Sequence, residues 1–162
     1  MDRIDRKILA LYQHDTRRIA ESIGAEVGLS AAAVQRRLKR LRANGAIRGE
    51  IAVLDARAAG VPVLCITLLT MASRPKPAAH LDRFREEMRR LPQVQQCYQV
   101  TGTSDFVLAI TAESLEDFGQ FVHQRFEANE NVIRFESFVV IDKVKIGLAL
   151  PVPCRETPSA AY

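Results

Sequence analysis

The sequence predicts an α+β protein in two parts, a basic helical part followed by a part in which strands and helices alternate. The first observation is charge. Residues 1–50 carry 11 Lys and Arg against 6 Asp and Glu, whereas the rest of the chain is close to neutral. The second is hydrophobic spacing, which follows the helical period up to about residue 43 and then gives apolar runs separated by two amphipathic stretches. A length of 162 residues suits one large domain or two small ones.

Composition and charge exclude several classes of protein. The chain is 48% hydrophobic and 26% charged, unlike disordered or collagen-like chains. The first seven residues carry five charges, and the longest uncharged stretch, residues 58–73, is shorter than the roughly 20 residues of a membrane helix. Three widely spaced cysteines form no CxxC motif. We therefore expect a cytoplasmic protein with no membrane partner, no metal site and no cofactor.

Two short helices are predicted before residue 29. Ile4, Ile8 and Leu11 lie on one helical stripe, and two aspartates stand in the first turn, where the helix dipole favours negative charge. The second helix is expected over residues 19–27. It is followed by Gly28, which suits a left-handed position after a helix end.

A basic helix is predicted next, with Ser30 as its N-cap. Val34, Leu38 and Leu41 form its buried stripe, and residues 30–44 contain five basic and no acidic side chains. Small residues at its start allow close approach to a groove, Gln can pair with adenine, and Arg can pair with guanine or phosphate. The expected DNA-binding residues are Ser30, Ala31, Ala32, Gln35, Arg36, Lys39, Arg40 and Arg42.

A small hairpin is predicted over residues 46–53. Helix, helix, turn, basic helix and hairpin is the order of a winged helix-turn-helix. We expect Gln35 and Arg36 to contribute to sequence choice, and Arg40 and Arg42 to hold phosphates. A basic helix alone is compatible with a merely solvated surface, but the tight turn, the one-sided charge and the hairpin together favour double-stranded DNA as a partner.

The second part is predicted to be a ferredoxin-like βαββαβ domain. Its strands are expected over residues 61–71, 94–101, 106–111 and 132–140, and its helices over residues 78–91 and after the cap at Ser114. Helices cover one face of such a sheet, and the chain has nothing left to cover the other. We therefore expect a homodimer that packs two such faces together.

The expected boundaries follow from these elements. The winged helix-turn-helix domain spans residues 1–54, and residues 55–60 form a linker. The ferredoxin-like domain, through which the dimer is expected to form, spans residues 61–150. A proline-rich tail occupies residues 151–162.

Three motifs are spread along the chain. Asp-x-x-Asp-x-x-Ile-Leu opens it at residues 2–9, Gly-Leu-Ser precedes an Arg-Arg-x-x-Arg-Leu helix at residues 28–41, and Val-Thr-Gly-x-x-Asp occupies residues 100–105. From residue 2 to about residue 152, the chain resembles the leucine-responsive regulator (Lrp/AsnC) family of transcription factors. The resemblance implies a DNA-binding winged helix and a ligand-sensing ferredoxin-like domain. It also implies dimers that often assemble into octamers, with small effectors, most often amino acids, bound between dimers near the Gly-x-x-Asp turn.

The resemblance places the effector at Gly102, Thr103, Ser104 and Asp105. The carboxylate of Asp105 could pair with the ammonium group of an amino acid. In the alternative interpretation it stabilises the turn, because Asp in such loops often accepts hydrogen bonds from nearby backbone. Both interpretations remain open from the sequence.

An enzyme is not expected. His14, His80 and His123 match no catalytic or metal motif, and we expect His80 to be exposed to solvent. The expected function is a sequence-specific transcriptional regulator whose assembly or DNA affinity is modulated by a small effector. Two alternatives are a metabolite-binding ferredoxin-like protein and an architectural DNA-binding protein that needs no effector. The second alternative leaves about 90 near-neutral residues without a task.

Overall fold

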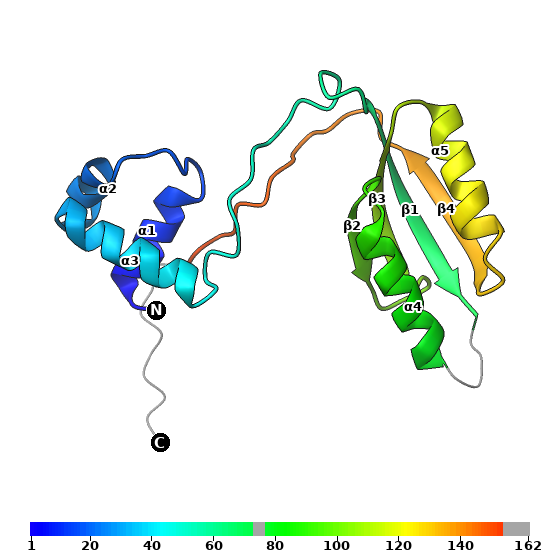
Figure 1. The fold of residues 1–162 in the computed structure, drawn as a ribbon, viewed down its shortest axis with the longest axis horizontal. Coiled ribbons are helices and arrows are strands. Elements are labelled where there is room, and N and C mark those ends of the chain that lie inside the picture. The colour runs from blue at the N-terminus through cyan, green and yellow to red at the C-terminus, as the bar shows by residue number, and fades with distance from the viewer. Residues whose placement is uncertain (73–76, 154–162) are drawn as a thin grey trace. The chain divides into compact units, whose positions relative to one another are not determined.

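The computed structural model describes residues 1–72 and 77–153. Its elements, in chain order, are α1 (Arg3–Tyr12), α2 (Ala20–Val27), α3 (Ala31–Ala43), β1 (Val63–Met71), α4 (Pro77–Arg90), β2 (Val94–Gln99), β3 (Phe106–Ala112), α5 (Leu115–Val122), the π-helical turn η1 (His123–Glu127) and β4 (Val132–Val139) (Figure 1). They belong to two compact units. One consists of residues 1–52 with residues 145–153, and the other of residues 53–144.

The first unit is a three-helix domain around a small core. Ile8 from α1, Ile23 from α2 and Val34 from α3 are fully buried, as the helical spacing predicted. Gly28 has a φ of 74°, so α2 ends in the left-handed conformation that glycine adopts without a Cβ clash. The next helix begins three residues later, after the Ser30 cap. The predicted helix-turn-helix is confirmed.

The hairpin predicted over residues 46–53 is wrong, because none of these residues lies in a strand. The backbone N–H of Ile47 instead donates to the carbonyl of Leu41 at 3.0 Å. The Glu50 carboxylate accepts hydrogen bonds from Tyr12 of α1 and Arg42 of α3. A lone two-stranded hairpin is marginal in water, and these contacts hold the segment against the helices without strand pairing.

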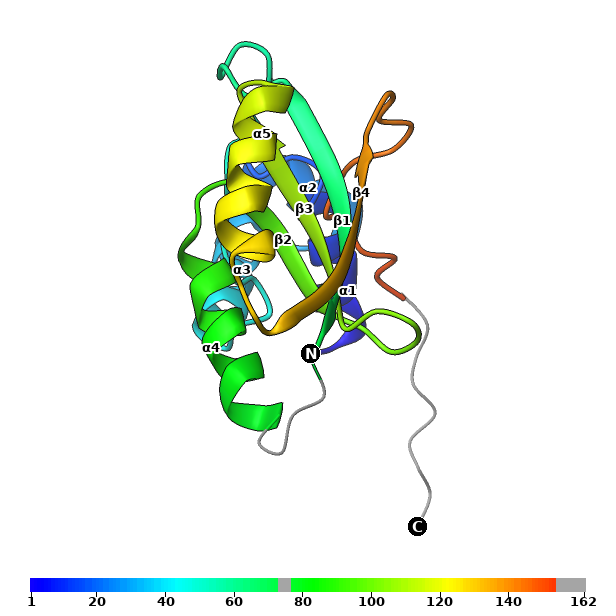
Figure 2. The ribbon, with the colours of Figure 1, turned by 90° about the vertical axis from the view of Figure 1, so that its right-hand side faces the viewer.

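The second unit is a four-stranded sheet in the order β2-β3-β1-β4, with every neighbouring pair antiparallel. Both α4 and α5 lie on the same side of the sheet (Figure 2). This is the predicted ferredoxin-like βαββαβ arrangement. The central strand β1 joins partners that are distant in sequence, because Cys65 lies opposite both Ile110 of β3 and Val139 of β4.

The core of this unit lies between the sheet and the two helices. Phe84 of α4 packs on Phe106 of β3 with ring centroids 4.8 Å apart. After α5 the chain makes the π-helical turn, and Phe126 within it lies 5.6 Å from the ring of Phe121 and 5.7 Å from that of Phe135. The apolar side chain of Leu115, at the start of α5, does not join this core, because it remains 58% exposed.

The opposite side of the sheet is covered by no part of this unit that the structure describes. Alternate residues of the strands point there, and those of β1, β2 and β4 are half-buried or exposed, whereas Ala109 and Thr111 of β3 are buried. We call this surface the open sheet face. Its apolar residues are Leu64, Ile66, Leu68, Tyr98, Val107 and Phe138.

Candidate nucleic-acid interface and effector turn

The turn between α2 and α3 brings the two helices into very close contact. Gly24 is buried, and a Cβ atom built on it would lie 2.4 Å from the carbonyl oxygen of Leu29. Leu29 also donates its backbone N–H to the carbonyl of Gly24 at 3.0 Å. Ser30 then caps α3, with its hydroxyl accepting the Ala33 N–H at 3.3 Å. The start of α3 is therefore fixed by backbone contacts to α2.

The outward face of α3 combines small, amide and cationic side chains. Ala32, Gln35, Arg36 and Lys39 are exposed, and Ala31 is half-buried at the start of the helix. Among the described residues, the exposed Gln, Arg and Lys of this group make no hydrogen bond or ion pair through their side chains. They are available to a partner, and the sequence predicted this face correctly as the exposed one.

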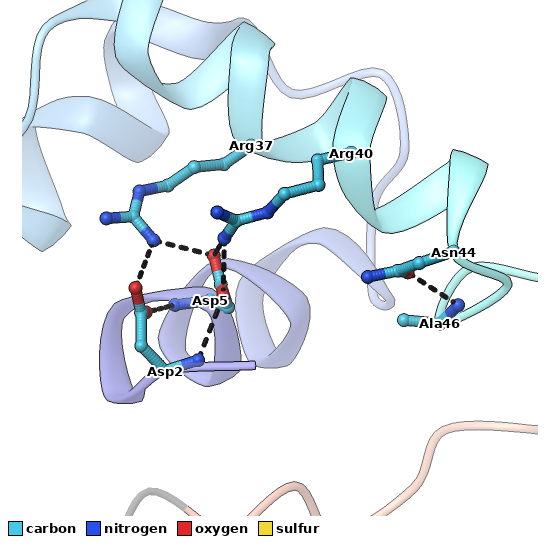
Figure 3. Close-up of polar contacts among 6 residues, drawn as sticks. All are labelled: Asp2, Asp5, Arg37, Arg40, Asn44 and Ala46. Carbon is cyan, nitrogen blue, oxygen red and sulfur yellow. Dashed lines mark hydrogen bonds and ion pairs between the residues drawn. The ribbon is translucent and has the colours of Figure 1, made fainter.

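The other cations of α3 have partners in α1 (Figure 3). Arg40 donates one nitrogen to both Asp5 oxygens, at 2.8 and 2.7 Å. Arg37 donates to Asp5 at 2.7 Å and to Asp2 at 2.5 Å. Asp2 and Asp5 also cap each other's backbone N–H groups in a capping box. Four side chains thus form one network between the first turn of α1 and the middle of α3.

Asp5 is the buried centre of this network, with a relative exposure of 0%. Burial alone would raise the pKa of Asp5, but hydrogen bonds from the Asp2 backbone and from Arg37 outweigh it and lower the pKa. The pKa of Asp2 is also lowered, chiefly by its hydrogen bond from Arg37. Both carboxylates are therefore ionised at neutral pH, and a buried carboxylate needs such partners.

Arg42 belongs to a second network at the end of α3. Its guanidinium donates to Glu50 at 3.0 and 2.9 Å and to the Tyr12 hydroxyl at 2.7 Å. The guanidinium carbon lies 5.5 Å from the centroid of the Tyr12 ring, within cation–π range. The hydrogen bond from Arg42 lowers the pKa of Glu50. Arg42 therefore ties α1, α3 and the segment after α3 together.

The predicted effector turn lies between β2 and β3. Gly102 has a φ of 118°, which a side chain would strain, and Gly102 and Thr103 are exposed, whereas Ser104 and Asp105 are half-buried. The Asp105 carboxylate accepts the backbone N–H of Met71 at 2.7 Å, which joins the turn to the end of β1. This hydrogen bond agrees with the interpretation in which Asp105 stabilises the turn.

A hollow of about 530 Å³ lies on the helix side of the same unit. Its lining includes Met71, His80 and Arg83, together with residues of the π-helical turn. His80 is half-buried rather than exposed as predicted, and its Nε2 atom is buried without a hydrogen-bond partner among the residues that the structure describes. Within the described ranges, no three His, Cys, Asp or Glu side chains lie close enough to hold a metal ion. No helix of the described chain is long and apolar enough to cross a bilayer.

Sequence reasoning missed the residues that connect α1 to α3. Tyr12, Arg37 and Glu50 were not singled out, and Asp2 and Asp5 were interpreted as helix-dipole partners and as part of a motif, with no partner in α3. The Asp-x-x-Asp spacing at the chain start was a signal for the capping box, because such a box joins residues three apart. Nothing in the sequence pairs those aspartates with arginines more than 30 residues away.

Comparisons with known proteins agree with this geometry. Residues 1–42 match the AsnC-type helix-turn-helix domain, and residues 67–150 match the Lrp/AsnC ligand binding domain. A helix-turn-helix transcriptional regulator of Sinorhizobium fredii is 37% identical over 94% of this chain and 89% of its own length. The leucine-responsive regulatory protein of Rhizobium meliloti is 34% identical over 90% of this chain and 92% of its own length.

A solved structure gives the same result. The AsnC family transcriptional regulator from Agrobacterium tumefaciens superposes with a TM-score of 0.84 and 27% identity, over 93% of this chain and 97% of the other. Both domains, in the same order, are therefore accounted for. The families and relatives that match are transcriptional regulators and not enzymes. The chain belongs to the Lrp/AsnC family of transcriptional regulators, with a DNA-binding helix-turn-helix domain followed by a ligand-binding domain.

Proposed function

We propose that the chain binds operator DNA as a dimer or higher assembly, and that a small effector, an amino acid, changes that assembly or its DNA affinity. The observation that carries the DNA side is the outward face of α3, where Gln35, Arg36 and Lys39 are exposed and without partners among the described residues. A regulator of chromosomal DNA works in the cytoplasm, where we expect this one. The proposed DNA-binding residues are Ser30, Ala31, Ala32, Gln35, Arg36, Lys39, Arg40 and Arg42.

Gln35 is the side chain that we propose reads a base edge. A bidentate amide-to-adenine contact discriminates against a wrong base by about 1–3 kcal/mol. Gln35→Ala should therefore weaken binding to the protein's own upstream DNA by that amount and hardly change binding to random duplex. Gln120→Ala, an exposed helical glutamine of the other unit, is the matched control. Equal loss on both DNAs would show that Gln35 does not read bases.

The open sheet face supports the proposed homodimer. Tyr98 and Phe138 on it are 52% and 49% exposed, and the chain beyond β4 adds the exposed apolar residues Ile141 and Val144. An apolar surface of this extent is typical of an interface. Pairing two copies gives one recognition helix per half-site, with half-sites spaced by about 10 bp or a multiple. Larger assemblies, up to the octamer of the resemblance, would join such dimers.

The dimer has a direct test in the mass of the particle. Phe138→Lys places a charge on the open sheet face and should convert the assembly to monomers, measured by light scattering after size exclusion. Leu115→Lys places the same charge on an exposed apolar residue of the helix side and should leave the mass unchanged. A Phe138→Lys protein of wild-type mass would exclude this face as the interface.

The effector site is proposed at the turn formed by residues 102–105. Its exposed end offers backbone N–H groups for a carboxylate, and Asp105 offers a carboxylate for an ammonium group. The name of the leucine-responsive relative supports an amino acid. Because Asp105 also binds the Met71 N–H, an effector would share the carboxylate with the end of β1. Since the resemblance places effectors between dimers near this turn, occupancy would alter how dimers join.

Thermal-shift screening with the twenty amino acids identifies the effector, because a ligand that binds the folded state raises its apparent stability. Asp105→Asn keeps an acceptor for Met71 and removes the charge. It should abolish effector binding in calorimetry while leaving effector-free DNA binding unchanged. Asp142→Asn, in the exposed segment after β4, is the matched control. Wild-type effector affinity in Asp105→Asn would leave only the architectural role. If no amino acid binds, the effector-independent alternative replaces this proposal.

A further inference from the structure

A hollow of about 440 Å³ on the first unit is lined by three arginines of α3. We call it the three-arginine hollow; it is formed by Leu29, Ala33, Arg36, Arg37 and Arg40. We propose that it is a seat for one backbone phosphate of duplex DNA, and that the buried Asp5 is the positioning residue that keeps two of its arginines in place. This inference rests on DNA binding through α3, and it assigns Arg36 to the DNA backbone instead of a base edge.

The geometry leaves donors free for a phosphate. A guanidinium has five N–H donors in a fixed fork. Arg40 uses one nitrogen for both Asp5 oxygens, and its side chain remains 56% exposed. Arg37 likewise uses one nitrogen for Asp2 and Asp5. The remaining nitrogens of both groups can donate to a phosphate in the hollow, together with Arg36, whose side chain has no partner in the described parts of the chain.

The charge of the site suits one monoanion. Three arginines and two aspartates, all ionised at neutral pH, leave a net charge of +1. A phosphodiester group carries one negative charge. Neither aspartate needs to touch DNA, and Asp5 cannot, since its relative exposure is 0%. Any effect of Asp5 on DNA binding must therefore pass through Arg37 and Arg40.

Positioning is what the aspartates contribute. A free arginine loses much of its rotamer freedom when a ligand immobilises it, and a side chain that is already held loses less. Figure 3 shows both guanidinium groups directed back from α3 toward the first turn of α1. The opposite possibility is that the aspartates merely neutralise two arginines and so reduce the attraction for DNA. The two possibilities predict opposite signs for the effect of removing the Asp5 charge.

The test measures DNA affinity against salt concentration, between about 50 and 200 mM, by fluorescence anisotropy. The probes are a random-sequence duplex and the protein's own upstream duplex. Arg36→Gln and Arg40→Gln should each reduce the salt slope by about 0.9 per bound subunit. Each should weaken both duplexes by the same factor, about tenfold, as loss of a charged hydrogen bond does. Arg90→Gln removes an exposed cation of the other unit and should change neither quantity.

Asp5→Asn is the deciding variant. The amide oxygen can still accept the Asp2 N–H in the capping box, so the change mainly removes the charge that holds the arginines. The proposal expects binding to both duplexes to weaken by roughly threefold to tenfold, although the protein becomes more positive. Combined with Arg40→Gln, the loss should be smaller than the product of the two single effects, because both act on the same contact.

Tighter DNA binding by Asp5→Asn, or an unchanged salt slope in Arg36→Gln, would overturn the phosphate seat. Far-UV circular dichroism checks folding of Asp5→Asn. If that variant unfolds, Asp2→Asn replaces it, because Asp2 is half-exposed and holds only Arg37. Failure of the seat is distinguishable from failure of DNA binding through α3. In the first case wild-type binding stays steep in salt and Gln35→Ala loses sequence preference. In the second, all variants and the wild type bind alike.

Discussion

Gly24 is the position where the smallest change should most disturb the helix-turn-helix. A methyl group there would lie 2.4 Å from the Leu29 carbonyl oxygen and must move by at least 0.6 Å to reach the 3.0 Å of the tightest normal contacts. The clashing atom belongs to the backbone of Leu29. That residue is held by the hydrogen bond from its N–H to the Gly24 carbonyl and by the Ser30 cap that follows. The two helices must therefore separate.

The size of the effect follows from two opposing terms. Alanine is about 1 kcal/mol better than glycine inside a helix, which would favour the variant. Overpacking against a fixed neighbour costs about 1–3 kcal/mol, and the immobile backbone places Gly24→Ala at the upper end of that range. We expect the first unit to lose about 2 kcal/mol of unfolding free energy.

Urea unfolding measures this loss as a lower midpoint urea concentration, with the slope of free energy against urea unchanged. The signals are tyrosine fluorescence, to which Tyr12 contributes, and helical circular dichroism. Gly119→Ala is the matched control, since this exposed helical glycine of α5 has no atom within 4 Å of its built Cβ. It should stabilise the second unit by up to about 1 kcal/mol. Gly24→Ala as stable as the wild type would refute the reasoning, because the close approach would then not constrain the turn.

Three further changes have defined outcomes. Ser30→Ala removes the N-cap of α3 and should cost the first unit about 1 kcal/mol in urea unfolding. Phe126→Ala empties a fully packed site in the second unit and should cost about 3–5 kcal/mol there, while the first unit, followed by NMR, keeps its stability. Acid should also destabilise the first unit. The folded pKa values of Asp2 and Asp5 lie below the ordinary value of 3.8, so their contribution is complete above that pH and is lost as pH falls through the folded values. Asp2→Asn should flatten the decline that urea titrations record below about pH 4.

Spacing of apolar residues was enough to predict most of the fold. Val34, Leu38 and Leu41 are buried because residues three and four apart lie on the same face of a helix. Cys65 and Leu69 are buried because alternate residues lie on the same face of a strand. The same periodicity could not predict the π-helical turn η1 after α5. A π-helical turn holds about one residue more than an α-helical turn, and the spacing of apolar residues in the sequence does not reveal it. The hairpin was wrong for a related reason. The prediction rested on residues 46–53 alone, and contacts of this segment with α1 and α3 formed instead of strand pairing.

The site was predictable only in part. Exposure of Gln35 and Arg36 follows from the helical phase of the buried stripe, and the structure places them on the outward face as expected. The partners of Arg40 and Arg42 depend on how α1 packs on α3, which no short-range pattern encodes. Both had been expected to hold phosphates, and in the structure their guanidinium groups are engaged with the carboxylates of Asp5 and Glu50.

The pairing of β1 sets the order in which parts of the chain can fold during synthesis at the ribosome. Helices α1 to α3 contact one another within the first 43 residues, so the helix-turn-helix can form soon after they emerge, because local contacts form fast. Residues 145–153 join the same unit later. Strand β1 must wait far longer for all its partners, since Cys65 pairs with Val139, which is synthesised much later. Until β4 arrives, one hydrogen-bonding edge of β1 is open to any strand nearby. Chaperone capture of nascent chains should therefore be greatest while residues between β1 and β4 are being added.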